Sequence, residues 1–277
     1  MRVLAPESLG DACRMLAQEE GLVPMAGATD LLVHWPTNLR ARERSYIDLW
    51  GLEELRGHAW SDDELTLNAL CTYWDIVNDP RARAEFPMLV VAARQVGAVQ
   101  IQARGTWAGN VVNASPAADG VPVLMAHDAV VDLVSASGER SVRLDSFYSG
   151  YKQMDRRPDE LVRAVRVPRR EHDVQVFEKV GSRRAQTISK VGLAVAHSSA
   201  GWRVVAASMA PTVCRCASVE AMLEAETPVL EPEEFLGAID ADVTPIDDVR
   251  SNAAYRRLTM ARVLYHALRP RCSWIGA

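Results

Sequence analysis

Residues 104–124, RGTWAGNVVNASPAADGVPVL, are unusual in a chain whose residues are 24% charged. The stretch carries only Arg104 and Asp119 as charges, and the rest is mostly Gly, Ala, Ser, Asn and Val, with one tryptophan, Trp107. Small side chains let a backbone come close to a bulky ligand, and glycine also permits positive φ. The stretch therefore predicts a backbone-lined loop against a ligand, with a tightly packed structural loop as the alternative.

The polar groups of this stretch are neutral. Gly105 and Gly109 flank the tryptophan, and neutral donors and acceptors come from Thr106, Asn110, Asn113 and Ser115. Accessible backbone and neutral side chains suit a pyrophosphate and a sugar that are held without many basic groups. The chain has neither the G-K-[ST] of a triphosphate loop nor the G-x-G-x-x-G of a conventional NAD fold at this point.

A second glycine-centred turn lies at residues 24–32, PMAGATDLL. A short apolar strand is expected to run into Gly27, followed by Thr29 and Asp30 and then by a helix. Backbone N–H groups at such a turn are unpaired and can receive phosphate oxygens. An ordinary strand-to-helix turn, with Asp30 as the helix cap, is the alternative.

A third candidate is residues 177–195, FEKVGSRRAQTISKVGLAV, which join two predicted strands. The pair Arg183 and Arg184 is expected to be solvated. Lys179, two residues after Phe177 in the predicted strand, is expected to project towards the same ligand.

The whole chain has 277 residues, 48% of them hydrophobic, and a net charge of −5. These values argue against disorder and against a nucleic-acid binder with a dominant basic face. The first residues lack the apolar core of a secretion signal, and no run approaches the ~18 apolar residues of a membrane span. We therefore expect a cytoplasmic protein without a membrane span.

The cysteines and histidines do not form a recognisable set of metal ligands or catalytic residues. The five cysteines are odd in number and widely spaced, which indicates reduced thiols. Cys214 and Cys216 form a C-x-C pair without a second nearby pair, whereas cluster sites need about four ligands. The six histidines are scattered. No metal ligand and no catalytic residue is therefore predicted in this chain.

The order of the elements predicts an α+β protein in three parts. Residues 1–55 indicate a small β-α-β unit with a parallel sheet, including a turn into a helix over 28–35. Residues 56–170 indicate an antiparallel sheet with hairpins at 62–63 and 137–139, and a helical stretch in two pieces broken near Pro80 and Pro87. Residues 171–277 indicate three antiparallel strands and helices, the last of them capped by Ser251 or Asn252.

Taken together and in this order, these stretches resemble the FAD-binding (medium) subunit of the molybdenum hydroxylases, the xanthine dehydrogenase and carbon monoxide dehydrogenase type. MAGATDLL is similar to the family's A-G-G-T-D turn, with Ala28 for the second glycine. TWAGNVVNASPAADGVPVL is similar to T-I-G-G-N followed by A-S-P-x-x-D-x-x-P-x-L, with Trp107 for isoleucine and Ala108 for glycine. EKVGSRRAQTISKV, SFYSGYKQMDRRPDELVRAVRVP and the YRR at Tyr255 also match.

The resemblance implies a two-part FAD-binding domain of the PCMH or vanillyl-alcohol-oxidase type, followed by a C-terminal domain. It also implies the cofactor site. The turn and the loop would flank the FAD pyrophosphate, Ser115 and Asp119 would hold the cofactor, and Lys179, Val96 and Val162 would lie near the isoalloxazine ring. The expected cofactor-binding residues are Pro24, Met25, Ala26, Gly27, Ala28, Thr29, Asp30, Leu31, Val96, Thr106, Trp107, Ala108, Gly109, Asn110, Ser115, Asp119, Val162 and Lys179.

In function, the resemblance implies a subunit that passes electrons from [2Fe–2S] clusters of a small partner subunit through FAD to an external acceptor. A large partner subunit would carry the molybdopterin cofactor and hydroxylate an N-heterocycle or an aldehyde, in an (αβγ)2 assembly. A stand-alone FAD-dependent oxidoreductase, of the enolpyruvyl-glucosamine reductase type, is the second hypothesis. The third is a non-catalytic nucleotide-binding or assembly module.

Overall fold

A parallel sheet opens the chain in the computed structural model, which describes residues 2–34 and 44–276. Its strands are β1 (Arg2–Leu4), β2 (Val23–Met25) and β3 (Ser45–Asp48), in the order β1-β3-β2. Helix α1 (Leu9–Gln18) connects β1 to β2, and its cap Ser8 accepts the Asp11 N–H at 3.1 Å. Helix α2 (Leu31–His34) follows β2, while position 35 of the predicted helix lies outside the described residues. The β-α-β prediction is confirmed.

The second sheet is antiparallel and has five strands in the order β4-β5-β10-β6-β7. They are β4 (His58–Trp60), β5 (Glu64–Asn68), β10 (Leu161–Pro168), β6 (Val130–Ser135) and β7 (Gly138–Arg143). Both predicted hairpins are present, β4–β5 and β6–β7. The short ribbon β8 (Tyr148–Gly150) and β9 (Gln153–Met154) and the 3-10 turns η1 (Glu53–Leu55) and η2 (Leu144–Ser146) complete this part.

Helices pack on this sheet, and the two prolines divide them differently from the prediction. The helical stretch has three pieces rather than two: α4 (Tyr73–Asn78), α5 (Pro80–Glu85) and α6 (Pro87–Gln95). Each proline starts a new helix, where its missing N–H leaves no hydrogen bond unmade. Asp79 caps α5 by accepting the N–H groups of Arg81 and Ala82. Helix α7 (Val99–Gln102) follows.

The small-residue stretch is helical, and the predicted long loop is wrong. Helix α8 (Trp107–Asn113) starts at its cap Thr106, whose hydroxyl accepts the Gly109 N–H at 3.0 Å, and α9 (Gly120–Ala126) begins after Asp119. Glycine, valine and asparagine are poor helix formers, so the sequence favours a loop. Burial overrides this preference, because all seven residues of α9 are buried.

The C-terminal part has a fourth strand beyond the three that the sequence predicts. Strands β11 (His172–Val180), β12 (Val191–Ser198) and β13 (Gly201–Ala207) form the antiparallel sheet, and the two-residue β14 (Cys214–Arg215) joins its edge. The helices are α10 (Ala217–Glu224), α11 (Leu236–Asp242) after the 3-10 turn η3 (Pro232–Phe235), and α12 (Ala253–Leu268). Asn252 is the cap of α12 and accepts the Tyr255 N–H at 2.7 Å.

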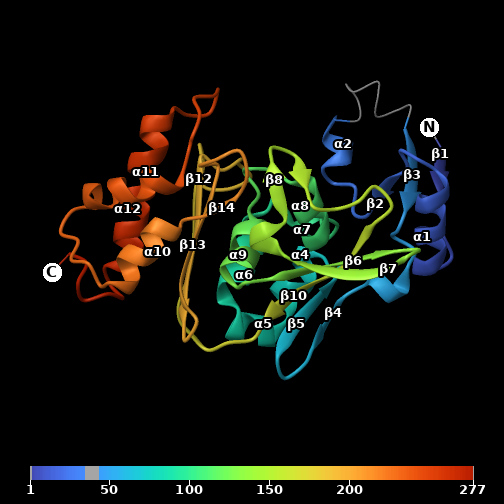
Figure 1. Cartoon of the computed structure of the whole chain (residues 1–277), viewed down its shortest axis with the longest axis horizontal. Helices are drawn as coiled ribbons and strands as arrows, with labels where there is room; N and C mark the ends of the chain where they lie inside the picture. The colour runs from blue at the N-terminus through green and yellow to red at the C-terminus, as the bar shows by residue number, and fades with distance from the viewer. Residues whose placement is uncertain (1, 35–43, 277) are drawn as a thin grey trace.

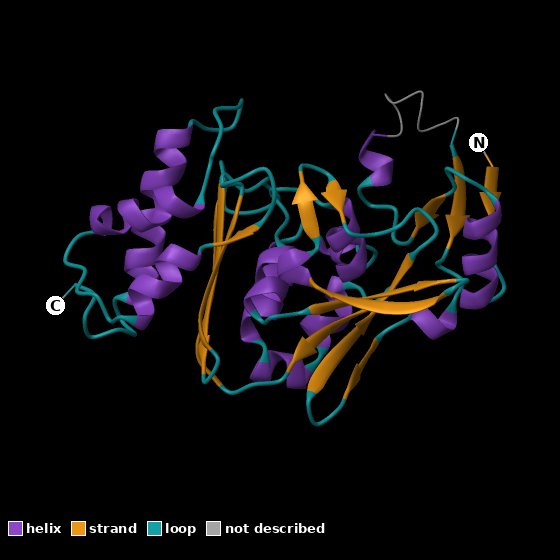
Figure 2. Ribbon diagram, in the orientation of Figure 1, coloured by secondary structure: helices purple, strands orange, loops and turns teal. Residues whose placement is uncertain are grey.

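This C-terminal sheet is buried on both faces, as Figure 1 shows by the helices on either side of β12 and β13. Leu193 and Val195 on β12 belong to the core under α10 and α12. Ala194 and Ala196, on the opposite face, belong to the core of the preceding part, where α9 packs against β12 and β13. The alanines on this strand face let α9 lie close to the sheet. Figure 2 shows the helix beside the sheet.

Asp128 fixes the C-terminal sheet to the preceding part. It follows α9 with φ +54°, and its carboxylate accepts from Arg170 at 2.6 Å and from Arg203 of β13 at 2.8 Å. Although burial raises the pKa of Asp128, the hydrogen bonds from the two guanidinium groups lower it below its ordinary value. These charged pairs therefore anchor the joint between the two parts.

His127 sits in the same joint and makes it sensitive to acid. Its side chain is fully buried between the rings of Phe86 and His172, at centroid distances of 5.0 and 4.7 Å, and neither ring nitrogen has a hydrogen-bond partner among the described residues. Burial, assisted by the nearby His172, lowers the pKa of His127 to about 3.

We predict that His127→Leu flattens the fall in stability on acidification. The unfolded chain binds a proton at a pKa of roughly 6.5, well above the folded value, so stability is lost as pH falls below that point. Between pH 7 and pH 5 this histidine alone accounts for about 2 kcal/mol. Urea unfolding of both proteins at the two pH values measures the difference. An equal loss in both proteins would contradict the assignment.

Candidate functional site

The predicted turn at residues 24–32 leaves β2 and enters α2, and several of its backbone N–H groups have no acceptor among the described residues. Pro24 and Met25 belong to β2, Ala26 packs on the core, and Leu31 begins α2. The backbone N–H groups of residues 27–31 donate to no other described residue. A run of unpaired N–H groups is the kind of cradle that phosphate oxygens occupy.

This turn lies directly against the entry to α8. A Cβ placed on Gly27 would overlap the carbonyl of Arg104, so the two backbones are in contact and only glycine fits. A Cβ on Gly105 would lie 3.3 Å from the Thr29 hydroxyl. The Asp30 carboxylate accepts the side-chain amide of Asn113 at 3.0 Å. The structure thus brings together two turns that are more than seventy residues apart in the chain.

The start of α8 adds neutral groups to this junction. A Cβ on Gly109 would lie 2.8 Å from the Thr106 hydroxyl, so the absence of a side chain lets that hydroxyl cap the helix. The side-chain oxygen of Asn110 accepts the Gly120 N–H at 3.1 Å, which ties α8 to α9. The Asn110 amide nitrogen and the Ala108 N–H donate to no other described residue.

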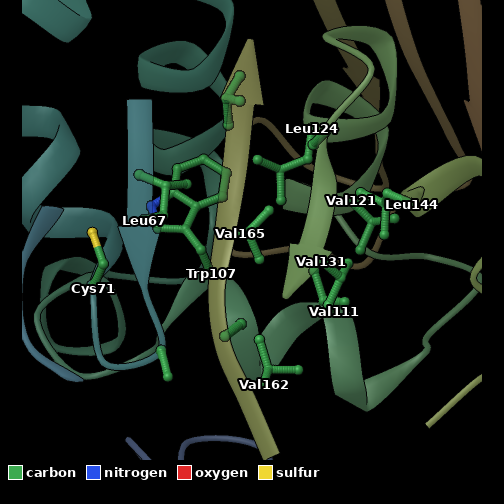
Figure 3. Packing of buried hydrophobic residues seen from close by; sticks show 14 of the residues in the cluster. Leu67, Cys71, Trp107, Val111, Val121, Leu124, Val131, Leu144, Val162 and Val165 are labelled. Carbon is green, nitrogen blue, oxygen red and sulfur yellow. The ribbon is translucent and has the colours of Figure 1, made fainter. Parts of the chain in front are cut away.

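Trp107 packs behind the junction. Its side chain is fully buried and lies 4.9 Å from the ring of Tyr73, and Figure 3 shows it among the core residues Leu67 and Val165. Its backbone N–H donates to the Cys71 carbonyl at 3.1 Å, and its buried indole N–H has no hydrogen-bond partner among the described residues. The large side chain fills the core, and neither the indole nor the backbone N–H faces outward.

Lys179 of β11 and Asp119, just before α9, form a buried ion pair. The ammonium lies 2.6 Å from the carboxylate and 3.2 Å from the Gln95 carbonyl, and the Ser189 hydroxyl donates to the same carboxylate at 2.9 Å. The side chain of Lys179 is 5% exposed. Burial raises the pKa of Asp119, and the ammonium and the hydroxyl oppose that rise. The pair joins the C-terminal sheet to the start of α9.

The remaining predicted residues surround this network. The Ser115 hydroxyl accepts the Ala117 N–H at 3.3 Å in the segment between α8 and α9. Val96 is half-buried at the end of α6, and Val162 is buried on β10 at a register shift. Sequence reasoning missed Gln95 and Ser189, because a backbone carbonyl and an isolated serine give no signal before the fold brings them to Lys179 and Asp119.

The donor set fits a dinucleotide cofactor held by backbone and neutral groups. The groups at the junction are backbone N–H donors, hydroxyls, side-chain amides and the Asp30 carboxylate, and the buried Lys179–Asp119 pair lies at the start of α9. Within residues 2–34 and 44–276, no group of three histidine, cysteine or acidic side chains is arranged to hold a metal ion. The same part of the chain contains no helix that is long and apolar enough to cross a membrane.

The fold and this junction define a nucleotide-cofactor-binding protein with a fused C-terminal domain, and comparison with known families makes the class specific. Residues 1–170 match the family of the FAD binding domain in molybdopterin dehydrogenase, and residues 177–270 match the CO dehydrogenase flavoprotein C-terminal domain. The chain belongs to the family of FAD-binding medium subunits of molybdenum hydroxylases, which are oxidoreductase subunits.

Relatives support this membership over most of the chain. The chain is 28% identical to the putative xanthine dehydrogenase FAD-binding subunit of Escherichia coli strain K12, over 90% of this chain and 88% of that protein. It is 30% identical to the glyceraldehyde dehydrogenase medium chain of Sulfolobus acidocaldarius, over 91% of each. A solved structure of reconstituted CO dehydrogenase from Oligotropha carboxidovorans has the same fold, with a TM-score of 0.89 and 21% identity over 99% of this chain and 98% of that one.

The two alanines that replace family glycines lie in different backbone conformations. Ala28 has φ +60°, in the left-handed region, whereas Ala108 lies inside α8. We predict that Ala28→Gly stabilises the protein by about 1 kcal/mol, because it removes the Cβ from a left-handed residue. Ala108→Gly is the matched control and destabilises by about 1 kcal/mol or more, because it weakens a helix. Urea unfolding of the two variants measures both effects, and shifts of the same sign would contradict the assignment.

Proposed function

We propose that this chain binds FAD at the junction of the Gly27–Asp30 turn with the start of α8, and passes electrons from a partner subunit to an external acceptor. FAD supplies this chemistry when bound, because it exchanges electrons singly with iron–sulfur clusters and in pairs with other acceptors. The residues that carry the proposal are those predicted from the sequence, with Ser189 and Gln95 added. Trp107 takes a packing role.

The observation that carries the proposal is the backbone contact of Gly27 with Arg104. It brings the turn against the residues that precede α8. The N–H groups of the turn, the Ala108 N–H and the Asn110 amide nitrogen donate to no other described residue. These groups would hold the pyrophosphate by hydrogen bonds from neutral donors. Ser115 would hold the sugar hydroxyls, and Asp119, whose carboxylate lies 2.6 Å from the Lys179 ammonium, would lie at the same end of the cofactor as that lysine.

Lys179 is proposed to face the isoalloxazine ring. Its ammonium is anchored by two acceptors, Asp119 and the Gln95 carbonyl, which hold a positive charge in a buried place. Because the Asp119 carboxylate balances this charge, the ammonium would act towards the flavin as a fixed hydrogen-bond donor. Val96 and Val162 would supply the apolar wall that excludes water.

The partner chains and the substrate follow from the family alone. The described residues offer no ligand set for an iron–sulfur cluster or molybdenum. From the family membership we propose a small [2Fe–2S] subunit and a large molybdopterin subunit, in an (αβγ)2 assembly. The relatives are named for xanthine and glyceraldehyde dehydrogenases, so an N-heterocycle and an aldehyde are the two substrate classes proposed for the complete enzyme. The division at residues 55 and 170 and the cytoplasmic location stay predictions.

The proposal is tested by the spectrum and the composition of the purified protein. We expect the tagged chain, expressed in its own host, to carry flavin absorption and to co-purify with two further chains, one with iron–sulfur and one with molybdenum. A chain without flavin would contradict both flavoprotein hypotheses. A flavin-containing chain that is purified alone, and that oxidises a simple donor at full activity, would favour the stand-alone oxidoreductase instead.

A further inference from the structure

The geometry points to Arg256 of α12 as a positioning residue of the cofactor site, a proposal that rests on the FAD site proposed above. Arg256 lies outside that site, in the C-terminal helical layer. Its side chain is 4% exposed, which is rare for an arginine. Its hydrogen bonds connect it to the two backbone segments that contact Asp119 and the residues just before it.

The guanidinium of Arg256 clamps two backbone segments at once. Its Nη1 donates to the Lys190 carbonyl at 3.0 Å and to the Ser208 carbonyl at 2.8 Å. Its Nη2 donates to the Asp248 carboxylate at 2.8 Å, which balances the buried charge. A planar guanidinium with several fixed donors can serve three acceptors in one place, which a lysine ammonium cannot do with the same geometry.

Two chains of hydrogen bonds run from this clamp to the segment that carries Asp119. In one, the Ser208 N–H donates to the Pro116 carbonyl at 2.7 Å. In the other, the Ser208 hydroxyl donates to the Ser189 carbonyl at 2.9 Å, and the Ser189 hydroxyl donates to the Asp119 carboxylate at 2.9 Å. Lys179 lies on the far side of that carboxylate.

Ser208 needs such a clamp because its backbone is strained. Its φ is +64°, in the left-handed region, and the residue is buried. A non-glycine residue keeps this conformation only where its surroundings hold it. Without Arg256 the Ser208 and Lys190 carbonyls would lose their buried donor, so Ser189 would no longer be held against Asp119. The carboxylate would then have Lys179 as its sole side-chain donor among the described residues.

The first test is hydrogen–deuterium exchange of the whole chain without FAD. Arg256→Met is expected to raise deuterium uptake in peptides covering residues 114–120 and 187–190, which are distant from it in sequence. Arg257→Met is the matched control, because Arg257 is the next residue of the same helix, is partly exposed, and has Asp240, at 3.4 Å, as its ion-pair partner among the described residues. Uptake that rises only around residues 245–260 would overturn the proposal.

The second test is a double-mutant cycle on FAD affinity. Arg256→Met and Ser189→Ala are each expected to weaken FAD binding about tenfold, as the loss of a hydrogen bond to a charged group does. If Arg256 acts through Ser189, the double variant binds FAD no more weakly than Arg256→Met. Losses that multiply to about a hundredfold, or wild-type affinity in Arg256→Met, would overturn the positioning role.

Arg256→Lys is a milder variant for the case that Arg256→Met does not fold. FAD binding by the wild-type chain distinguishes failure of the positioning role from failure of the proposed function. Lysine keeps the positive charge but lacks the planar set of donors. The deuterium uptake and the FAD affinity of Arg256→Lys are therefore expected between those of the wild type and of Arg256→Met. If even the wild type bound no FAD, the proposed function would fail and the positioning role with it, whereas the exchange experiment would still show whether the clamp holds residues 114–120.

Discussion

The structure of the proposed cofactor site depends on one contact between backbones, Gly27 against the carbonyl of Arg104. No side chain can occupy that space, so the parallel-sheet unit and the entry to α8 meet only when residue 27 is glycine. The contact places a turn with unpaired N–H groups beside a helix start with neutral donors. Each half alone is an ordinary turn, and the proposed dinucleotide site requires both.

The other side of residues 104–124 packs closely on the C-terminal sheet. Helix α9 is buried along its whole length and packs on the alanine face of β12 and β13. That sheet brings Lys179 to Asp119, and the serine between the strands supplies the second donor. The small residues of 104–124 therefore serve two contacts, one with the proposed cofactor and one with the sheet.

Much of the fold could be predicted from the sequence where local chemistry decides it. The turn residues Asp62–Asp63 placed a hairpin correctly, and Asn252 was one of two predicted caps for the last long helix. The helices α8 and α9 could not be predicted, because their glycines, valines and asparagines favour a loop until tertiary burial overrides that preference. The two-residue strand β14 is too short to give a periodic signal.

The residues of the candidate site could be proposed from sequence motifs, but the contacts between them could not. The glycine turn, Asn110, Asp119 and Lys179 were found because their patterns resemble a family, and the fold brings them into one neighbourhood. The left-handed backbone of Ala28, the burial of Trp107 and the reach of Arg256 depend on contacts between segments far apart in the chain. No pattern within a single segment encodes such contacts.

The most direct measurement of the central claim is the FAD dissociation constant of Gly27→Ala, with Gly51→Ala as the control. A Cβ on Gly51 meets no atom within 4 Å, so that variant is expected to bind FAD as the wild type does. A Cβ on Gly27 forces the turn away from Arg104, and we expect FAD binding to weaken by roughly a hundredfold or more, with the far-ultraviolet circular dichroism unchanged. Wild-type affinity in a folded Gly27→Ala protein would contradict the account.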